Sequence, residues 1–348
     1  WARTPRRGSH TCLAGLTCEP QAEPLQPVPM ITAVPGIRVG HYTDEIGLTG
    51  CSVALCDRPA VGGVELRGWA TGVHGLDFLD PRHLVPTLDG VVLSGGSAFG
   101  LEAVFGAMQY LEEQGRGFQA GPTVVPHVPG AILFDLNVGT PNARPTRAMG
   151  YRACLAATSD SVQEGNVGAG TGATVGKLFG IGRAMKGGIG SASVRISKAV
   201  VGALVAVNAL GDVRDAENGR LLAGARDAPN GRRLIDSAAL MQQGTAPPGF
   251  RPLEHTTIGV IATDARLSKA EAAKAAQLGM MGFARALSPP HTHLDGDVLF
   301  CLSLGDVEVE LTALGLAAGE AVARAIARAV KAAASLPGLP SWQELFGS

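Results

Sequence analysis

The sequence predicts a layered α/β fold, in which β-strands lie between layers of helices. Short apolar segments of strand length alternate along the chain with longer segments that carry helix capping signals. No obvious interdomain linker separates them. Since 348 residues suffice for one large domain or two small ones, we expect residues 30–348 to form a single layered domain.

The first half of the chain contains two short strands and a helix. Residues 51–56 and 90–94 are mostly apolar and short, which is typical of buried strands. A helix is predicted from Ser97 to about Gln114, because serine is a favoured N-cap residue and Gly115 stands where a C′ glycine belongs.

The second half contains a long buried strand followed by two strand–helix units. Residues 198–210 are almost wholly apolar, which predicts a strand covered on both faces. Residues 214–252 form the longest loop-like segment, and loops of that length are usually functional or mobile. A capping box, Ser268-x-x-Glu271, opens the first of the two helices. The remaining elements are predicted at residues 256–263 (strand), 268–287 (helix), 298–304 (strand) and about 316–334 (helix).

The composition argues against two classes of partner. The formal net charge is -1 and no basic block is present, which argues against binding to nucleic acid. No apolar segment reaches the length of a membrane span. With 48 glycines and only 5% aromatic residues, the core must be built from Val, Ala, Leu and Ile, with backbones in close approach.

Two further features concern the compartment and the N-terminal boundary. The six cysteines form no zinc-type CxxC pair, so we interpret them as small hydrophobes in a reducing, cytoplasmic environment. Residues 1–29 are rich in Pro, Arg and Thr and lack the apolar core of a signal peptide. We predict that they are a disordered or non-native extension and that the ordered domain starts at Met30.

Two glycine-rich segments match functional motifs only in part. Residues 94–100 approach the G-x-S-x-G nucleophile elbow, but Phe99 stands where the second glycine is required. Residues 168–177 approach a phosphate-binding loop, but Thr171 and Leu178 replace its required Gly and Ser/Thr. A helix N-cap and a tight glycine-lined turn are therefore the preferred interpretations.

A polar cluster precedes the last predicted strand. On an extended segment, His291, His293, Asp295 and Asp297 share one face, and such a set is able to hold a metal ion. Alternatively, the two aspartates form a carboxylate pair whose mutually perturbed pKa values suit proton transfer beside a nucleophile. A polar turn without chemistry is the third interpretation.

Thr256 stands at the junction between a polar, Pro/Gly-rich segment and an apolar strand. If the peptide bond before it broke, its hydroxyl would be a nucleophile. Its freed α-amine, with a pKa of about 7.7–8.0, would be the base. The structural alternative is that threonine opens the strand only because of its β-propensity.

Four motifs in this order and spacing resemble those of the L-aminopeptidase/D-esterase family. This family of self-processing N-terminal-nucleophile hydrolases includes β-peptidyl aminopeptidases and nylon-oligomer hydrolases. The resemblance covers roughly residues 31–336, and it rests on residues 165–177, 205–208, 256–265 and 295–297.

The resemblance implies an αββα sandwich of the N-terminal-nucleophile-hydrolase type. It implies one cleavage, between His255 and Thr256, into a large chain (30–255) and a small chain (256–348). These two chains stay together, and such pairs assemble into a homo-oligomer, commonly a tetramer.

The resemblance also implies a role for each of five residues. Thr256 matches the nucleophile, Asn208 the asparagine that donates to the oxyanion, and Lys177 a lysine near the nucleophile. Asp295 and Asp297 match the acidic partners of the nucleophile, and neither a cofactor nor a metal is required. Capping of a strand end by Asn208 and surface exposure of Lys177 are the structural alternatives.

One residue departs from the family pattern: the nucleophile usually follows Asn or Gly, and here it follows His255, which adopts strained backbone conformations less readily. We still expect cleavage, and then hydrolysis of small peptides or amino-acid amides or esters. The scissile bond lies next to a small N-terminal amino acid, and the reaction passes through an acyl-Thr256 intermediate. The alternatives are an endo-acting hydrolase of linear amide oligomers, an unprocessed and catalytically silent paralogue, and a metallohydrolase.

Overall fold

The computed structural model describes residues 30–244 and 255–347. The main feature of this part of the chain is a nine-stranded sheet in the order β10-β11-β14-β16-β2-β4-β7-β3, with β1 paired to β2. These strands are β1 (Ile37–Asp44), β2 (Thr49–Gly68), β3 (Val73–His74), β4 (Thr87–Ser94), β7 (Gly130–Ile132), β10 (Gly188–Ile196), β11 (Ala199–Asn208), β14 (Thr256–Ala265) and β16 (Gly296–Val307).

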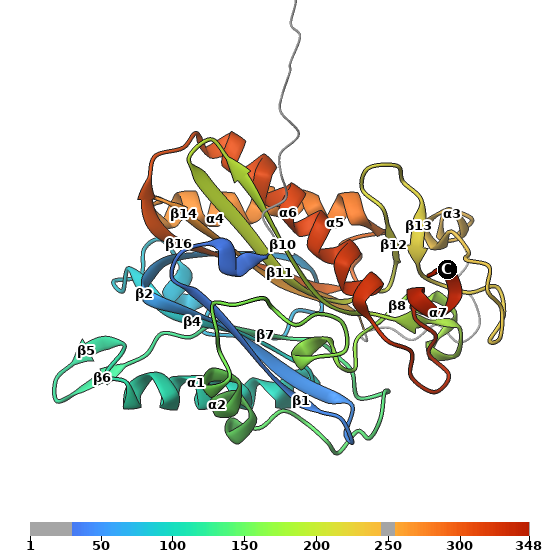
Figure 1. Cartoon of the computed structure of the whole chain (residues 1–348), viewed down its shortest axis with the longest axis horizontal. Helices are drawn as coiled ribbons and strands as arrows, with labels where there is room; N and C mark the ends of the chain where they lie inside the picture. Colours follow the sequence, from blue (N-terminus) through green and yellow to red (C-terminus); the bar gives the residue numbers. More distant parts are fainter. Residues whose placement is uncertain (1–29, 245–254, 348) are drawn as a thin grey trace, which may run out of the picture.

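Strand β2, with 20 residues, belongs to two layers of this sheet. Its first half pairs with β1 and β4, and its second half pairs with β16. Between these halves, the ladder with β4 shifts register from Leu55 to Ala60, where residues 57–59 are exposed. A strand that bends in this way lets one sheet fold into two stacked layers (Figure 1).

Helices cover both outer faces of the stacked layers (Figure 1). Three apolar clusters separate the layers: one under α4, α5 and α6, one between the two strand layers, and one over α1 and α2. The αββα sandwich implied by the sequence is therefore confirmed. The helices are α1 (Glu102–Glu113), α2 (Arg147–Leu155), α3 (Ser237–Met241), α4 (Lys269–Gly279), α5 (Met281–Ala286), α6 (Leu311–Ala332) and α7 (Trp342–Phe346).

Smaller elements complete the described part of the chain. The short strands are β5 (Phe118–Ala120), β6 (Thr123–Val125), β8 (Thr174–Val175), β9 (Met185–Lys186), β12 (Asp212–Arg214), β13 (Leu221–Ala223) and β15 (Leu287–Ser288). The 3-10 turns are η1 (Ile31–Ala33), η2 (Asp77–Leu79), η3 (Ser97–Leu101), η4 (Gly168–Gly170), η5 (Lys177–Phe179) and η6 (Ile181–Arg183).

Glycine allows the helices to approach the sheet closely. A Cβ on Gly190 of β10 would lie 2.2 Å from the carbonyl oxygen of Ala325 in α6. A Cβ on Gly63 of β2 would lie 2.3 Å from the backbone of Ala272 in α4. Contacts of this kind need glycine on the strand and alanine on the helix, which accounts for a core with so few aromatic residues.

Side-chain alternation decides which residues face the space between the strand layers. In β14, Ile258 packs between the layers and Ile261 packs under the helices. In β11, Ala206 packs between the layers. The two-residue period therefore places Asn208 and Thr256, which pair across the two strands, on this inner face at one end of the sheet.

The prediction that Ser97 caps the first helix is wrong. Ser97 lies inside turn η3 with a φ of 55°, and its backbone N–H donates to the carbonyl of Leu133 at 3.0 Å. This bond ties the turn to the residue after β7, so the α-helix begins only at Glu102. At the other end, Gly115 has a φ of 66°, as expected of a C′ glycine.

The helix predicted at residues 268–287 begins as expected but is shorter. Its capping box is formed, with Ser268 and Glu271 each bonding the other's backbone N–H. The helix is interrupted at Met280, where α4 ends and α5 begins. Leu287, its predicted last residue, instead pairs with β12 as part of β15.

Four cysteines fall in the described part of the chain, and all are buried free thiols: Cys51, Cys56, Cys154 and Cys301. This agrees with their interpretation as small hydrophobes. The other two cysteines and the predicted extension at residues 1–29 lie outside the described residues. Of the long loop predicted at 214–252, the described part contains β13 and α3, so that part is not one continuous loop. Among the described residues, no helix is both long and apolar enough to cross a membrane.

Candidate active site

Three neighbouring strands bring the predicted site residues to one end of the sheet. Asn208, the last residue of β11, pairs with Thr256, the first residue of β14. Asp297 lies at the start of β16, and Asp295 forms a β-bridge with His255 just before these two strands become a parallel ladder. These residues are all buried, and none of them is more than 3% exposed.

The peptide bond between His255 and Thr256 is contacted from two directions. The Thr256 hydroxyl donates to the His255 carbonyl oxygen at 2.5 Å, so its Oγ1 lies beside the carbonyl of the bond predicted to break. The backbone N–H of Gly296 donates to the same oxygen at 3.0 Å. Two donors on one carbonyl polarise it toward nucleophilic attack.

The Gly296 donor is a group at the candidate site that the sequence did not indicate. A backbone N–H has no residue-specific signature, and the glycine between two aspartates reads as a turn. The structure explains why glycine is required at position 296, because a Cβ here would lie 2.2 Å from the carbonyl oxygen of Ala70. Only glycine lets β16 begin this close to the chain that follows β2.

The side-chain amide of Asn208 is held on both sides. Its Oδ1 accepts from the Thr174 N–H at 2.9 Å and from the Lys177 ammonium at 2.9 Å. Its Nδ2 donates to the Phe134 carbonyl at 2.9 Å. The network therefore fixes which end of the amide is the donor. Lys177 also donates to the Asn208 carbonyl at 2.8 Å and is only 2% exposed, so its interpretation as a surface lysine is wrong.

The two aspartates have separate partners. Asp297 accepts from the Thr257 N–H at 2.7 Å through Oδ1 and contacts the His291 ring Nδ1 at 2.9 Å through Oδ2. Asp295 accepts from both the hydroxyl and the N–H of Thr292, at 2.5 and 2.9 Å. Each carboxylate is thus oriented by groups other than its neighbour.

Burial sets the acidity of Asp295. Loss of hydration raises the pKa of this carboxyl to about 6, and the nearby negative charge of Asp297 acts in the same direction. The bonds from Thr292 oppose this shift by stabilising the ionised form. A carboxyl with such a pKa exchanges its proton near neutral pH, which suits acid–base chemistry.

The geometry does not favour the metal alternative. Among the described residues, no three or more His, Cys, Asp or Glu side chains gather in a way that could hold a metal ion. The expected shared face requires an extended segment, but the strand begins only at Gly296 and His291 has a φ of 51°. The exposed ring of His293 packs edge-on against Trp69, with the two ring centroids 5.7 Å apart.

The glycine-rich segment at 168–177 packs against backbone, as expected of a tight turn. A Cβ on Gly170 would lie 2.3 Å from the Ile189 nitrogen, and one on Gly176 would lie 2.0 Å from the Gly224 carbonyl carbon. Lys177, which a phosphate loop would point at its ligand, bonds Asn208 instead. The segment therefore serves the strand end that carries Asn208.

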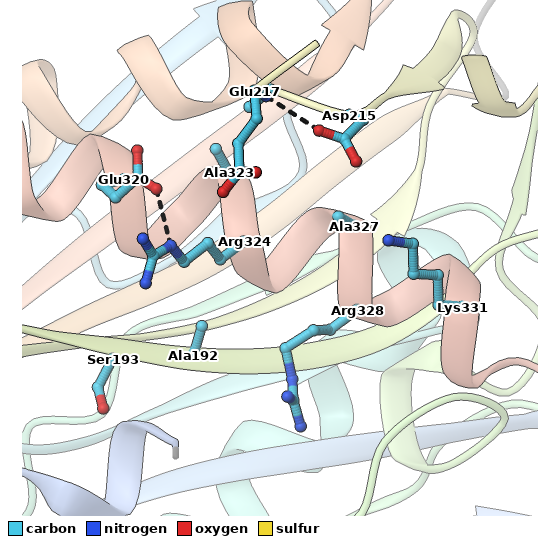
Figure 2. A pocket seen from close by; sticks show the side chains of 11 residues that line it. Ala192, Ser193, Asp215, Glu217, Glu320, Ala323, Arg324, Ala327, Arg328 and Lys331 are labelled. Carbon is cyan, nitrogen blue, oxygen red and sulfur yellow. Dashed lines mark hydrogen bonds and ion pairs between the residues drawn. The ribbon is translucent and has the colours of Figure 1, made fainter. Parts of the chain in front are cut away.

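A pocket of about 680 Å³ has a different set of lining residues (Figure 2). It opens between α6, β10 and residues 215–217, and it contains none of the predicted site residues. Two of its cations have acidic partners: Arg324 bonds Glu320, and Arg328 bonds Glu164. We therefore place the candidate active site at the start of β14, where the chemistry converges, and not in this pocket.

Comparison with known proteins identifies the family of the chain and agrees with its fold. The model of peptidase family S58 matches residues 29–341. The chain belongs to this family. An uncharacterized aminopeptidase of Mycobacterium leprae is 40% identical over 92% of this chain and 95% of its own length. A 6-aminohexanoate-oligomer endohydrolase of Kocuria sp. is 30% identical over 80% of this chain and 76% of its own length.

A solved structure supports the architecture of this S58 member. The L-aminopeptidase D-Ala-esterase/amidase from Ochrobactrum anthropi, described as a variant of the Ntn hydrolase fold, superposes with a TM-score of 0.67. The superposition covers 89% of this chain and 87% of that one at 21% sequence identity, so it shows a shared fold. The family resemblance seen in the sequence is confirmed, and the chain is a hydrolase of the peptidase and amidohydrolase class.

Proposed function

We propose that this protein cleaves its own His255–Thr256 bond and then uses the new N-terminal threonine to hydrolyse amides or esters. The observation that supports this most directly is the position of Thr256 Oγ1, which lies 2.5 Å from the oxygen of the carbonyl it would attack. That oxygen already accepts the Gly296 N–H, a donor suited to an oxyanion.

Self-cleavage proceeds by an acyl shift from nitrogen to oxygen. Thr256 Oγ1 bonds to the carbonyl carbon of His255, and the Gly296 N–H stabilises the negative charge on the oxygen. The carbon–nitrogen bond then breaks, and the nitrogen takes up the proton that Oγ1 has lost. Water hydrolyses the resulting ester, leaving a carboxylate on His255 and a free α-amine on Thr256.

The processed enzyme follows the same chemistry on a substrate. The α-amine of Thr256 accepts the hydroxyl proton while Oγ1 attacks the substrate carbonyl. When the carbon–nitrogen bond of an amide breaks, the resulting ammonium returns the proton to the leaving amine. Water then attacks the acyl-threonine ester and releases the acid, which is a small amino acid in the favoured case.

The other site residues have electrostatic roles in this scheme. Asn208 donates through Nδ2 to the tetrahedral oxyanion, and the bond from the same nitrogen to the Phe134 carbonyl helps to orient the amide. Lys177 lowers the proton affinity of the α-amine by like-charge repulsion. Asp297 orients the ammonium, and Asp295 bonds the hydroxyl or the amine.

The test is the intact mass of the purified protein under denaturing conditions. We expect two fragments, the smaller beginning at Thr256, in place of the 35.6 kDa chain. The Thr256→Ala variant should remain one chain. A single intact mass in the natural protein after long incubation would point to an unprocessed, silent paralogue, with His255 as the first suspect.

An endo-acting hydrolase of linear amide oligomers is the second candidate, and the 30% identity to the Kocuria enzyme favours it. Assay of the processed protein on an amino-acid p-nitroanilide and on a linear 6-aminohexanoate oligomer separates the two.

We also propose a homo-oligomer of processed pairs in the cytoplasm. Light scattering of the purified protein tests the assembly, and a single pair in solution would contradict it.

A further inference from the structure

A second buried lysine, Lys186 of β9, lies behind the candidate site. Its side chain is fully buried, and its ammonium donates to the carbonyls of Gly170, Ala173 and Gly187 at 2.8, 2.9 and 3.3 Å. The first two carbonyls belong to the glycine-rich turn. The site described above does not use this lysine, and its ammonium has no direct contact there with Asn208.

One peptide group connects Lys186 to Asn208. The carbonyl of the Ala173–Thr174 peptide accepts from the Lys186 ammonium at 2.9 Å. The N–H of the same peptide donates to Asn208 Oδ1 at 2.9 Å. A cation on the oxygen polarises the peptide and strengthens the bond that its N–H makes. The charge of Lys186 therefore reaches the oxygen end of the Asn208 amide.

At the nitrogen end of the Asn208 amide, a buried carboxylate follows the residue that accepts the hydrogen bond. Asn208 Nδ2 donates to the Phe134 carbonyl, and the next residue, Asp135, is only 2% exposed. Asp135 is anchored by the Gly96 N–H and the Thr49 hydroxyl, each at 2.7 Å. These two bonds fix the position of Asp135, and thereby the position of the preceding Phe134 carbonyl, which accepts from Asn208 Nδ2.

We propose that Lys186 and Asp135 are positioning residues for catalysis, which together hold the Asn208 amide in the orientation that presents its Nδ2 to the reacting carbonyl. The inference rests on the proposed function for its kinetic consequence, but not for the orientation itself. Lys186 acts through the Ala173–Thr174 peptide, and Asp135 acts through Phe134.

Burial of these two ionisable groups costs free energy, because both lose hydration. Loss of hydration lowers the pKa of Lys186 to about 7, and Asp135 is the acidic group whose charge opposes that shift. Burial likewise raises the pKa of Asp135, while its bonds from Gly96 and Thr49 and the charge of Lys186 oppose the shift. A buried pair of this kind is often no more stable than apolar residues of similar volume, and the proposed positional role accounts for its presence.

Lys269, which is half-buried, offers a control for the fully buried Lys186. Its ammonium also donates to three backbone carbonyls, those of Phe78, Asp80 and His83. It lies just beyond the opposite end of β14 from Thr256. Replacing either lysine by methionine removes one ammonium and three hydrogen bonds, but only Lys186→Met disturbs the amide of Asn208.

The kinetic test compares Lys186→Met, Lys269→Met and Asn208→Ala on an amino-acid p-nitroanilide, with the rate of self-cleavage as a second readout. We expect Lys186→Met to lower kcat about tenfold or more with KM unchanged, and Lys269→Met to leave both unchanged. In the Asn208→Ala background, Lys186→Met should add no further loss, because its effect passes through Asn208. Losses that multiply would overturn the proposal.

Two further measurements keep the test decisive. If Lys186→Met does not fold, the near-isosteric Asp135→Asn variant replaces it and must show the same loss of kcat and the same non-additivity. A crystal structure of Thr256→Ala combined with either variant needs no activity, so it remains informative if self-processing fails. We expect the Asn208 amide to rotate or shift there. An amide that keeps its bonds to Thr174 and Phe134 unchanged would overturn the proposal, whatever the catalytic result.

Discussion

The two ends of strand β14 use buried polar groups in opposite ways. At the Ala265 end, side chains bond the backbone where it leaves the sheet: Asp264 accepts the Val200 N–H at 2.7 Å, and Ser303 donates to the Ala265 carbonyl at 2.6 Å. At the Thr256 end, buried ionisable side chains bond the residues that adjoin or pair with Thr256: Lys177 bonds the side chain of Asn208, and Asp297 accepts the Thr257 N–H.

The difference separates structural polar groups from chemical ones. A neutral hydroxyl that satisfies a strand end is a normal way to terminate a sheet. Several buried ionisable groups at one strand end cost stability through lost hydration, and such clusters are typical of reactive sites. Substitutions at the two ends should therefore have different effects, with activity lost at one end and stability at the other.

The largest effect is expected for Thr256→Ala, which removes the proposed nucleophile. Self-cleavage and hydrolysis should both fall to background, because no other hydroxyl is proposed to attack. Thr263→Ala, at the other end of the same strand, removes a buried hydroxyl that accepts the Ala265 N–H, and it should be processed normally. Denaturing mass spectrometry of the two variants decides. A cleaved Thr256→Ala protein would refute the assignment.

Asn208→Ala should have the next largest effect. Removal of one oxyanion donor lowers kcat by about a hundredfold to a thousandfold, which corresponds to about 2.7–4 kcal/mol. Ser303→Ala removes a buried side chain of comparable polarity at the opposite end and should change stability without changing kcat. Steady-state kinetics on a chromogenic amide measures both. Equal losses of kcat in the two variants would mean that the ends do not differ.

The sequence indicated which side chains gather at this candidate site, but it did not indicate the backbone groups there. The predicted strands at β11 and β14 and the order of the motifs indicated that Asn208, Thr256 and the acidic pair lie together. Apolar patterns and family motifs can be recognised from the sequence alone. The Gly296 N–H was missed, since a backbone donor can be recognised only when another strand lies beside it. Lys186 was also missed, because an isolated lysine reads as a surface residue until three carbonyls are seen to enclose it.

Asp295→Asn should abolish a pH dependence. Burial raises the pKa of Asp295 to about 6, so kcat/KM should rise as pH increases through about 6 and the carboxyl ionises. The variant should lose this acidic limb and up to about a hundredfold in rate near neutral pH. A pH–rate profile of both proteins is the measurement. If kcat/KM of the variant still rose through about pH 6, the titration would belong to another group.

The same pKa shift predicts a stability change of known sign. The folded pKa of Asp295 lies above its ordinary value of 3.8, so the folded protein holds this proton more tightly than the unfolded chain. The contribution of the protonated carboxyl to stability is complete below about 4 and is lost as pH rises through about 6. Urea unfolding of the Thr256→Ala protein, with and without Asp295→Asn, should show that the amide removes this loss.

The smallest effect on activity is expected at the far end of β14. Asp264→Ala leaves the Val200 N–H of the buried strand β11 without its acceptor, which should lower the free energy of unfolding by about 1–3 kcal/mol. Processing and kcat should stay unchanged, because this end of the strand holds no group of the proposed reaction. Urea unfolding and the p-nitroanilide assay test the two parts separately. A variant with normal stability and impaired catalysis would show that the chemistry extends along β14, and the contrast between its ends would no longer hold.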